Sequence, residues 1–292
     1  MTMTQRIEDV RQHVERETRL DLVAKPLRGA AQRALSPAPA REVLSGRPIG
    51  HPLHPALVLV SGGALLSATV LDLVGGKGAR KASQRLIAVG LIAALPTAAS
   101  GLSDWMDTED AESRIGVVHA ASNSIALAAF TRSWRRHAAG KRGVLSSLTG
   151  AAALGAGGWL GGHLAYALGV GVDTTAFQSA AQDWTDVAAA TDIDDNLHQA
   201  HVDGVAILLT RVDGKVTALA DRCTHRDGPL SEGKRYDDCV VCPWHGSKFA
   251  LRDGAVLNGP ASRPQPAFEV REQNGRIEVR RTEPRALRRN PA

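Results

Sequence analysis

Four long apolar runs dominate the first part of the chain, at about residues 55–74, 86–103, 115–134 and 144–172. A helix that crosses a bilayer needs about 20 mainly apolar residues, with a range of about 17–25, and the second and third runs are at the short end. The runs are apolar on all sides, whereas the helices of a soluble bundle keep a polar face. Small residues, which let membrane helices pack closely, are abundant in residues 150–162. We therefore predict a four-helix transmembrane domain over residues 50–172 rather than a soluble bundle.

The pattern changes after the last run. A polar linker at residues 173–182 is followed by short segments of alternating apolar and polar residues, which are typical of β-strands. The predicted strands cover residues 184–187, 205–211, 215–220, 239–242, 248–251, 267–271 and 276–281. Asp213-Gly214 and Asn274-Gly275 are typical of tight hairpin turns. The sequence thus predicts a mostly β domain over residues 183–281.

Both ends of the chain are rich in charged residues. Residues 1–49 form a basic N-terminal tail without an apolar core segment, so no secretory signal is predicted. Ile7, Val10 and Val14 give a patchy helical pattern, which a solvated tail or a short soluble helix explains better than a helix on the membrane surface. Residues 282–292 contain several Arg and two Pro, and we predict that they form a disordered tail.

Two short motifs in the predicted β domain carry metal-binding side chains. Cys223 is followed by His225, and Cys242 by His245, with sixteen residues between His225 and Cys242. Two thiolates and two imidazoles suit zinc or an iron–sulfur cluster. A structural zinc finger more often has a Cys pair followed by a His pair, whereas this sequence repeats one Cys with one His. The repeat favours a centre in which two Cys hold one iron and two His hold the other.

The segments 223–230 (Cys-Thr-His-Arg-Asp-Gly-Pro-Leu) and 242–249 (Cys-Pro-Trp-His-Gly-Ser-Lys-Phe) resemble the two cluster loops of the Rieske [2Fe–2S] family. The resemblance extends over roughly residues 183–281 and implies an all-β Rieske domain. It also implies a [2Fe–2S] cluster whose four ligands come from the two loops. Cys223 and Cys242 would bind the buried iron, and His225 and His245 the outer one.

Residues near the second motif indicate the subtype. Ser247 matches the hydroxyl residue of high-potential Rieske proteins, but Phe249 stands where those proteins carry Tyr. Cys239 has no cysteine left to pair with, so the disulfide of the cytochrome bc type is absent. These differences point to the ferredoxin-like subtype. Because hydrogen bonds to cluster sulfurs raise the potential, we expect a value in the lower half of the Rieske range of about −150 to +300 mV.

Histidines gather at one predicted membrane face. With four antiparallel spans, that face collects His51, His54, His119 and His163, and the β domain follows from the same face. Ionisable residues in spans often mark functional sites, so this group is a candidate site for haem b, for a quinone headgroup or for a metal. The alternative is interfacial histidines that bind water, backbone or acidic groups. The His-Pro-x-His-Pro pattern that begins at His51 resembles a bacterial family of four-helix membrane proteins, which implies architecture but no chemistry.

The net charge of +5 does not indicate nucleic-acid binding, because the basic residues lie in the tails and in loops beside apolar runs. The first and third loops are basic and the second is acidic, which places both tails outside the cytoplasm. Against this, the basic N-terminal tail would have to cross without a signal, and clusters are assembled in the cytoplasm. We predict a multi-pass protein of the bacterial cell membrane and leave the side of the Rieske domain open.

The preferred function is one-electron transfer, between a redox partner protein and a quinone or haem site in the membrane domain. An oxygenase would need a further iron held by two His and a carboxylate, but the 47 residues after His245 contain no His. The alternative function is a redox-sensing or structural membrane protein that carries a Rieske cluster. The expected partners are the lipid bilayer and a redox protein or quinone.

Overall fold

The computed structural model describes residues 2–35, 38–178 and 182–281, and the chain divides into two compact units. Residues 1–46 and 52–170 form a helical unit, and residues 47–51 and 171–292 form a mostly β unit. The predicted disordered tail lies outside the described residues.

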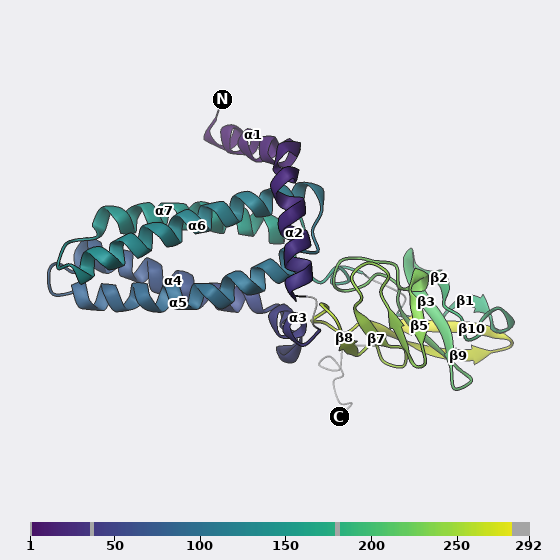
Figure 1. The fold of residues 1–292 in the computed structure, drawn as a ribbon. Helices are drawn as coiled ribbons and strands as arrows, with labels where there is room; N and C mark the ends of the chain where they lie inside the picture. Colours follow the sequence, from purple (N-terminus) through teal and green to yellow (C-terminus); the bar gives the residue numbers. More distant parts are fainter. Residues whose placement is uncertain (1, 36–37, 179–181, 282–292) are drawn as a thin grey trace. The chain divides into compact units, whose positions relative to one another are not determined.

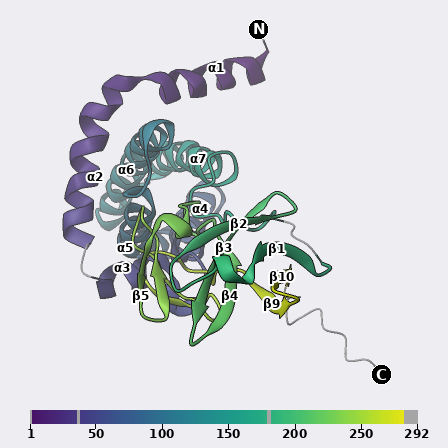
Figure 2. The same cartoon turned by 90° about the vertical axis from the view of Figure 1, so that its right-hand side faces the viewer.

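Four long helices form a bundle in the first unit (Figures 1 and 2). They are α4 (Leu53–Val74), α5 (Arg80–Trp105), α6 (Asp110–Ala138) and α7 (Val144–Tyr166), and they match the four predicted apolar runs. Leu65, Ile87 and Phe130 are fully buried between the helices. A Cβ at Gly150 would lie only 2.7 Å from the Phe130 ring, so glycine allows α6 and α7 to approach closely.

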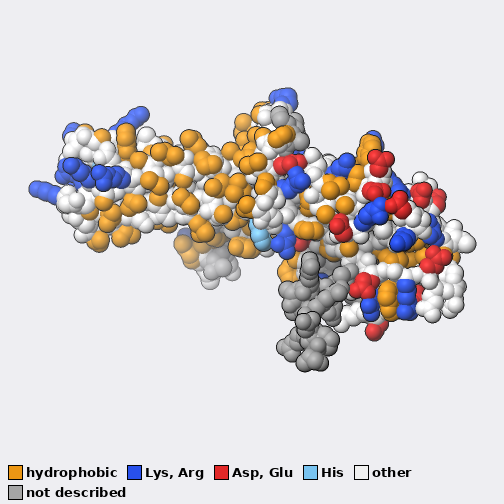
Figure 3. Space-filling model, turned by 90° about the horizontal axis from the view of Figure 1, so that it is seen from below, with side chains coloured by type: hydrophobic (Ala, Val, Ile, Leu, Met, Phe, Trp, Pro, Cys, Tyr) orange, Lys and Arg blue, Asp and Glu red, His pale blue; other side chains and the backbone are white. Residues whose placement is uncertain are grey.

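Two of the four helices, α4 and α5, are long and apolar enough to cross a membrane. The outer surface of the bundle is largely apolar, and Lys and Arg gather at one end of it (Figure 3). α6 carries acidic residues in its first turn and basic residues in its last, and small residues dilute the apolar character of α7. For α6 and α7, membrane crossing therefore stays a prediction.

The basic N-terminal segment is helical. It contains α1 (Met3–Arg16), the short 3-10 turn η1 (Thr18–Leu20), α2 (Asp21–Leu35) and α3 (Ala38–Ser45), and the 3-10 turn η2 (Arg47–Ile49) follows. Thr2 and Gln5 form a capping box at the start of α1, in which each side chain binds the backbone N–H of the other residue. α1 and α2 run across the bundle rather than along it (Figures 1 and 2).

The second unit contains two antiparallel sheets. The larger has the strand order β1 (Thr185–Ala189), β10 (Arg276–Arg281), β9 (Ala267–Gln273), β4 (Lys215–Ala220), β3 (Val205–Val212) and β2 (His198–Val202). The smaller has the order β5 (Lys234–Tyr236), β6 (Cys239–Val241), β7 (Lys248–Ala250) and β8 (Val256–Asn258). The predicted strands are all present, whereas β2, β5 and β8 were not predicted. The turns η3 (Ala190–Asp192) and η4 (Leu230–Glu232) are short 3-10 helices.

β3 is buried on both faces, which explains its continuous apolar sequence. Ile207 and Leu209 face a core formed with β10, and Leu208 faces a second core that includes both motif cysteines. The hairpin after β3 turns at Asp213 and Gly214, which both have positive φ as the sequence predicted. Because both motif cysteines belong to the second core, this core positions the metal-binding motifs.

Candidate metal centre

Two loops of the same construction carry the two motifs. In the first, the Cys223 N–H donates to the Gly228 carbonyl at 2.9 Å, and the Asp227 N–H donates back to the Cys223 carbonyl at 2.9 Å. In the second, the Cys242 N–H donates to the Ser247 carbonyl at 2.8 Å, and the Gly246 N–H donates to the Cys242 carbonyl at 3.2 Å. Asp227 and Gly246, four residues after each cysteine, both have positive φ. Each loop therefore closes on its own cysteine and fixes that residue's backbone.

The loops bring the two thiols together in the protein interior. Cys223 and Cys242 are both buried, and they share a hydrogen bond. This bond lowers the pKa of the Cys242 thiol to about 7, and it raises the pKa of Cys223. Backbone N–H groups of His225 and Arg226 also stabilise a thiolate at Cys223, as those of Trp244 and His245 do at Cys242. One thiol is thus readily ionised, which suits thiolate ligation of a metal.

The two imidazoles lie next to each other and closer to solvent. The rings of His225 and His245 meet edge to face with their centroids 5.2 Å apart, and both residues are partly exposed. Trp244, beside His245, is 55% exposed. A Cβ at residue 228 would lie 2.8 Å from the Cys242 sulfur, so glycine is needed for the loops to approach. Burial therefore decreases from the cysteines to the histidines.

The residues present fit a two-iron cluster. Two buried sulfur donors and two outer nitrogen donors match a centre in which the cysteines share one iron and the histidines the other. In the part of the chain that the structure describes, no three His, Cys, Asp or Glu side chains converge to hold a single metal ion.

Two buried polar side chains, which the sequence did not reveal, hold the first loop. The fully buried Asp221 carboxylate accepts hydrogen bonds from the Ser231 N–H at 2.6 Å and from Gln199 at 2.6 Å. The Gln265 amide accepts from the Thr224 N–H at 3.1 Å and donates to the Ala220 carbonyl. No sequence signal separates these residues from surface Asp and Gln, because their partners are far away in the chain.

The linker also binds the first loop. The Thr174 hydroxyl donates to the Cys223 carbonyl at 2.8 Å. Thr174 is the eighth residue after Tyr166, the last residue of α7. The chain that leaves the bundle therefore reaches a ligand-bearing loop before it enters the first strand.

Ser247 is fully buried, and its Oγ accepts a hydrogen bond from the Ala261 N–H at 3.1 Å. A hydroxyl that accepts one hydrogen bond can still donate its own hydrogen, so the role of Ser247 in tuning the cluster stays a prediction. Phe249 is fully buried in the same core and offers no hydroxyl.

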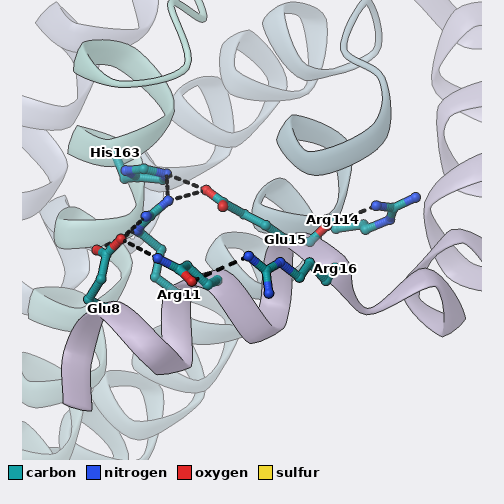
Figure 4. A network of polar contacts seen from close by, with 7 residues as sticks. Glu8, Arg11, Glu15, Arg16, Arg114 and His163 are labelled. Carbon is teal, nitrogen blue, oxygen red and sulfur yellow. Dashed lines mark hydrogen bonds and ion pairs between the residues drawn. The ribbon is translucent and has the colours of Figure 1, made fainter. Parts of the chain in front are cut away.

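The bundle histidines are held by protein groups. His54 Nδ1 lies 2.9 Å from the Thr97 carbonyl. His119 has both ring nitrogens engaged, Nδ1 by the Gly157 carbonyl at 2.8 Å and Nε2 by Asn123 at 3.1 Å. His163 Nε2 lies 2.8 Å from Glu15 of α1 (Figure 4).

The predicted haem site gains no support from this arrangement. His119 and His163, which haem was one option to join, bind different partners on different elements. His51 belongs to the second unit, where its Nε2 lies 3.4 Å from Arg263. The alternative of histidines satisfied by backbone and acidic groups describes the observed contacts.

A buried carboxylate at the end of the bundle away from His54 and His163 was not predicted from the sequence. Asp72 of α4 accepts hydrogen bonds from Ser83 of α5 at 2.6 Å and from Ser147 of α7 at 2.6 Å. His137 of α6 lies 2.9 Å from the same carboxylate, so all four helices meet at it. The signal was present, because Asp72 is the one acidic residue within the first predicted span.

Comparisons with known proteins agree with this geometry. Residues 183–269 match the family model described as Rieske [2Fe-2S] domain, and residues 50–174 match the one described as Predicted membrane protein (DUF2231). The chain is 39% identical over 72 residues to the 3-phenylpropionate/cinnamic acid dioxygenase ferredoxin subunit of Escherichia coli (strain K12), covering 24% of this chain and 68% of that protein. It is 32% identical over 100 residues to Ferredoxin CarAc of Metapseudomonas resinovorans, covering 34% of this chain and 94% of that protein.

Among solved structures, the chain is similar to one titled as a complex of reduced oxygenase and oxidized ferredoxin in carbazole 1,9a-dioxygenase. The sequence identity is 30%, and the match covers 35% of this chain and 99% of the other, with a TM-score of 0.34.

Proposed function

Because the chain belongs to the Rieske [2Fe-2S] family through its β domain and carries a predicted membrane protein domain before it, we propose that it is a membrane-anchored one-electron carrier. It exchanges electrons with a redox partner protein or with a quinone. The observation that carries the proposal is the decrease in burial across the site, from two buried thiols to two partly exposed imidazoles. The ferredoxin subunits among its relatives support a carrier role.

Each part of the site has a distinct task in this proposal. A [2Fe–2S] cluster held by Cys223, Cys242, His225 and His245 supplies one-electron chemistry. The backbone N–H groups around the two sulfurs stabilise added negative charge there, which favours the reduced state. The buried core behind the cysteines excludes water from that side. Electrons therefore enter and leave at the histidine edge, where Trp244 offers an apolar contact to a partner.

The membrane domain keeps the carrier beside a membrane pool of reductant. The first loop is held by Thr174, and only the residues after Tyr166 connect it to α7, so the carrier is confined to a short tether. This tether favours a quinol at the membrane surface as the electron donor, or a quinone there as the acceptor. The alternative role, a redox sensor or structural protein, requires the cluster but no electron exchange with a partner.

The test is electron exchange by the full chain in detergent micelles. The oxidised protein is mixed with a short-chain quinol, and bleaching of the visible absorption is followed together with the electron paramagnetic resonance of the reduced cluster. We expect one electron per chain, and no signal from the Cys242→Ser variant. A cluster that dithionite reduces, but that neither quinols nor a ferredoxin reductase reduce or oxidise, would exclude the carrier role and leave the sensor.

A further inference from the structure

The N-terminal helices α1 and α2 lie outside the four-helix bundle and cross its axis (Figures 1 and 2). A helix that lies across a membrane bundle runs in the plane of the bilayer. Both helices are amphipathic, with apolar residues on one side and charged residues on the others. The question is what covers their exposed apolar sides.

α1 is fixed to the bundle through its polar side (Figure 4). Arg11 forms ion pairs with Glu8 and Glu15, and it also lies 3.3 Å from His163 of α7. Glu15 lies 2.8 Å from the same His163. The Arg114 side chain of α6 donates to the Glu15 carbonyl at 2.8 Å. These contacts from two bundle helices prevent α1 from turning about its own axis.

The apolar residues of α1 form a stripe beside this contact. Met3, Ile7, Val10 and Val14 recur at helical spacing, and Met3 and Val10 are 75% and 64% exposed. With 3.6 residues per turn, the stripe lies roughly a quarter turn from the side that carries Arg11 and Glu15. The stripe is therefore held in one direction, and the bundle leaves Met3, Ile7 and Val10 exposed while Val14 is half-buried.

α2, like α1, has one side attached to the bundle and an exposed apolar side next to it. Ala24 and Ala31 are buried against the bundle, while Arg28 and Gln32 donate to the backbone carbonyls of Thr108 and Met106. Four exposed apolar residues, Val23, Leu27, Ala30 and Ala34, lie on one adjacent side, whereas Leu22, which is 79% exposed, lies on another. Leu27 is 51% exposed. Two helices with independent attachments thus expose an apolar stripe next to their contact side.

We propose that α1 and α2 form an interfacial collar that lies in the headgroup region of the bilayer, with both stripes inserted toward the acyl chains. α1 packs against α6, and α2 packs against α5 and α6, whose outer surfaces expose Leu95 and Ile125. A peripheral helix with a narrow apolar stripe and many charges is the kind that binds a lipid surface. Asp9 and His13, on the far side of α1, face water in this arrangement.

The test uses the full chain in nanodiscs of phosphatidylcholine and phosphatidylglycerol. A benzophenone amino acid replaces Ile7, Val10 or Leu27 in the stripes, and Asp9, His13 or Lys25 serves as the matched control position. After irradiation, mass spectrometry identifies the adducts. We expect phospholipid adducts from the stripe positions and no such adducts from the control positions.

Other results would overturn the collar. Adducts to protein peptides from the stripes would show that a second copy or the β domain covers them. Adducts to neither lipid nor protein, or equal lipid adducts from stripe and control positions, would show that the stripes do not face the bilayer. Quinol oxidation in the same nanodiscs is measured separately, so failure of the collar is distinguished from failure of electron transfer.

Discussion

The histidines of the β domain and those of the bundle are held in opposite ways. His225 and His245 project from matching loops, each next to a buried cysteine, and their rings lie together near solvent. His119 is enclosed by a backbone carbonyl and an amide, and His163 is paired with a carboxylate. A metal ligand keeps one ring nitrogen for the metal and commonly donates from the other. His119 has both nitrogens engaged by protein groups, and its contact with Gly157 joins α6 to α7.

The comparison shows that ionisable residues in a predicted span can be bound by protein groups alone. The bundle histidines attracted attention because ionisable groups in spans are costly. Hydrogen bonds from neighbouring helices offset the cost of burying these polar groups, as they do for Asp72. The cluster histidines are distinguished by their neighbours in sequence, a cysteine two or three residues before each of them.

The largest effect is expected from the cysteine ligands. Cys223→Ala removes one of two thiolate donors, so the purified protein should lose its cluster completely. Visible absorption, iron content and electron paramagnetic resonance report the loss. Cys239→Ala is the matched control, because Cys239 is also buried but its thiol donates to the Tyr236 carbonyl. If Cys239→Ala lost the cluster and Cys223→Ala kept it, the ligand assignment would be wrong.

A large loss of stability is expected at the opposite end of the bundle. Asp72→Asn removes the charge that accepts bonds from Ser83, Ser147 and His137. Leaving buried partners without their carboxylate should lower the free energy of unfolding by about 3 kcal/mol. Titration of the solubilised protein with sodium dodecyl sulfate measures it. Asp110→Asn is the control, since the Asp110 side chain is 90% exposed, and an equal effect of both variants would refute a structural role for the buried network.

A moderate loss of stability, without any loss of cofactor, is expected for His119→Ala. Two hydrogen bonds disappear, which should cost about 1–2 kcal/mol. The reduced-minus-oxidised spectrum should show bleaching of the cluster and no sharp haem α band, in the wild type as in the variant. A haem band in the wild type that His119→Ala abolishes would restore the axial-ligand hypothesis. His13→Ala, which alters an exposed histidine, controls for nonspecific effects.

The smallest effect is expected for Ser247→Ala. Loss of one hydrogen bond to a cluster sulfur, worth about 1 kcal/mol, should lower the reduction potential by roughly 40 mV for a one-electron couple. A redox titration monitored by circular dichroism measures the shift. The wild-type potential itself should lie in the lower half of the Rieske range, because Phe249 supplies no second hydroxyl. A wild-type value near the top of the range, or no change in the variant, would contradict this account of tuning.

The sequence by itself determined the four long helices, the hairpin strands and the four predicted ligands. Helices and hairpins follow from local periodicity and turn residues, and each ligand pair lies within one short loop. The missed strands β2, β5 and β8 are only three to five residues long, and pairing with neighbours forms them rather than their own pattern.

Only the tertiary structure decided which polar residues form hydrogen bonds or ion pairs with each other. Asp72 meets Ser147 across 75 residues of sequence, His163 meets Glu15 across 148, and Gln265 meets Thr224 across 41. No local pattern encodes such pairs, because each partner taken alone is an ordinary polar residue. Burial makes the pairing obligatory, since an unpaired polar group inside the protein is costly. For that reason the sequence could predict a cluster from two adjacent motifs, but not that the bundle histidines were already bound by the fold.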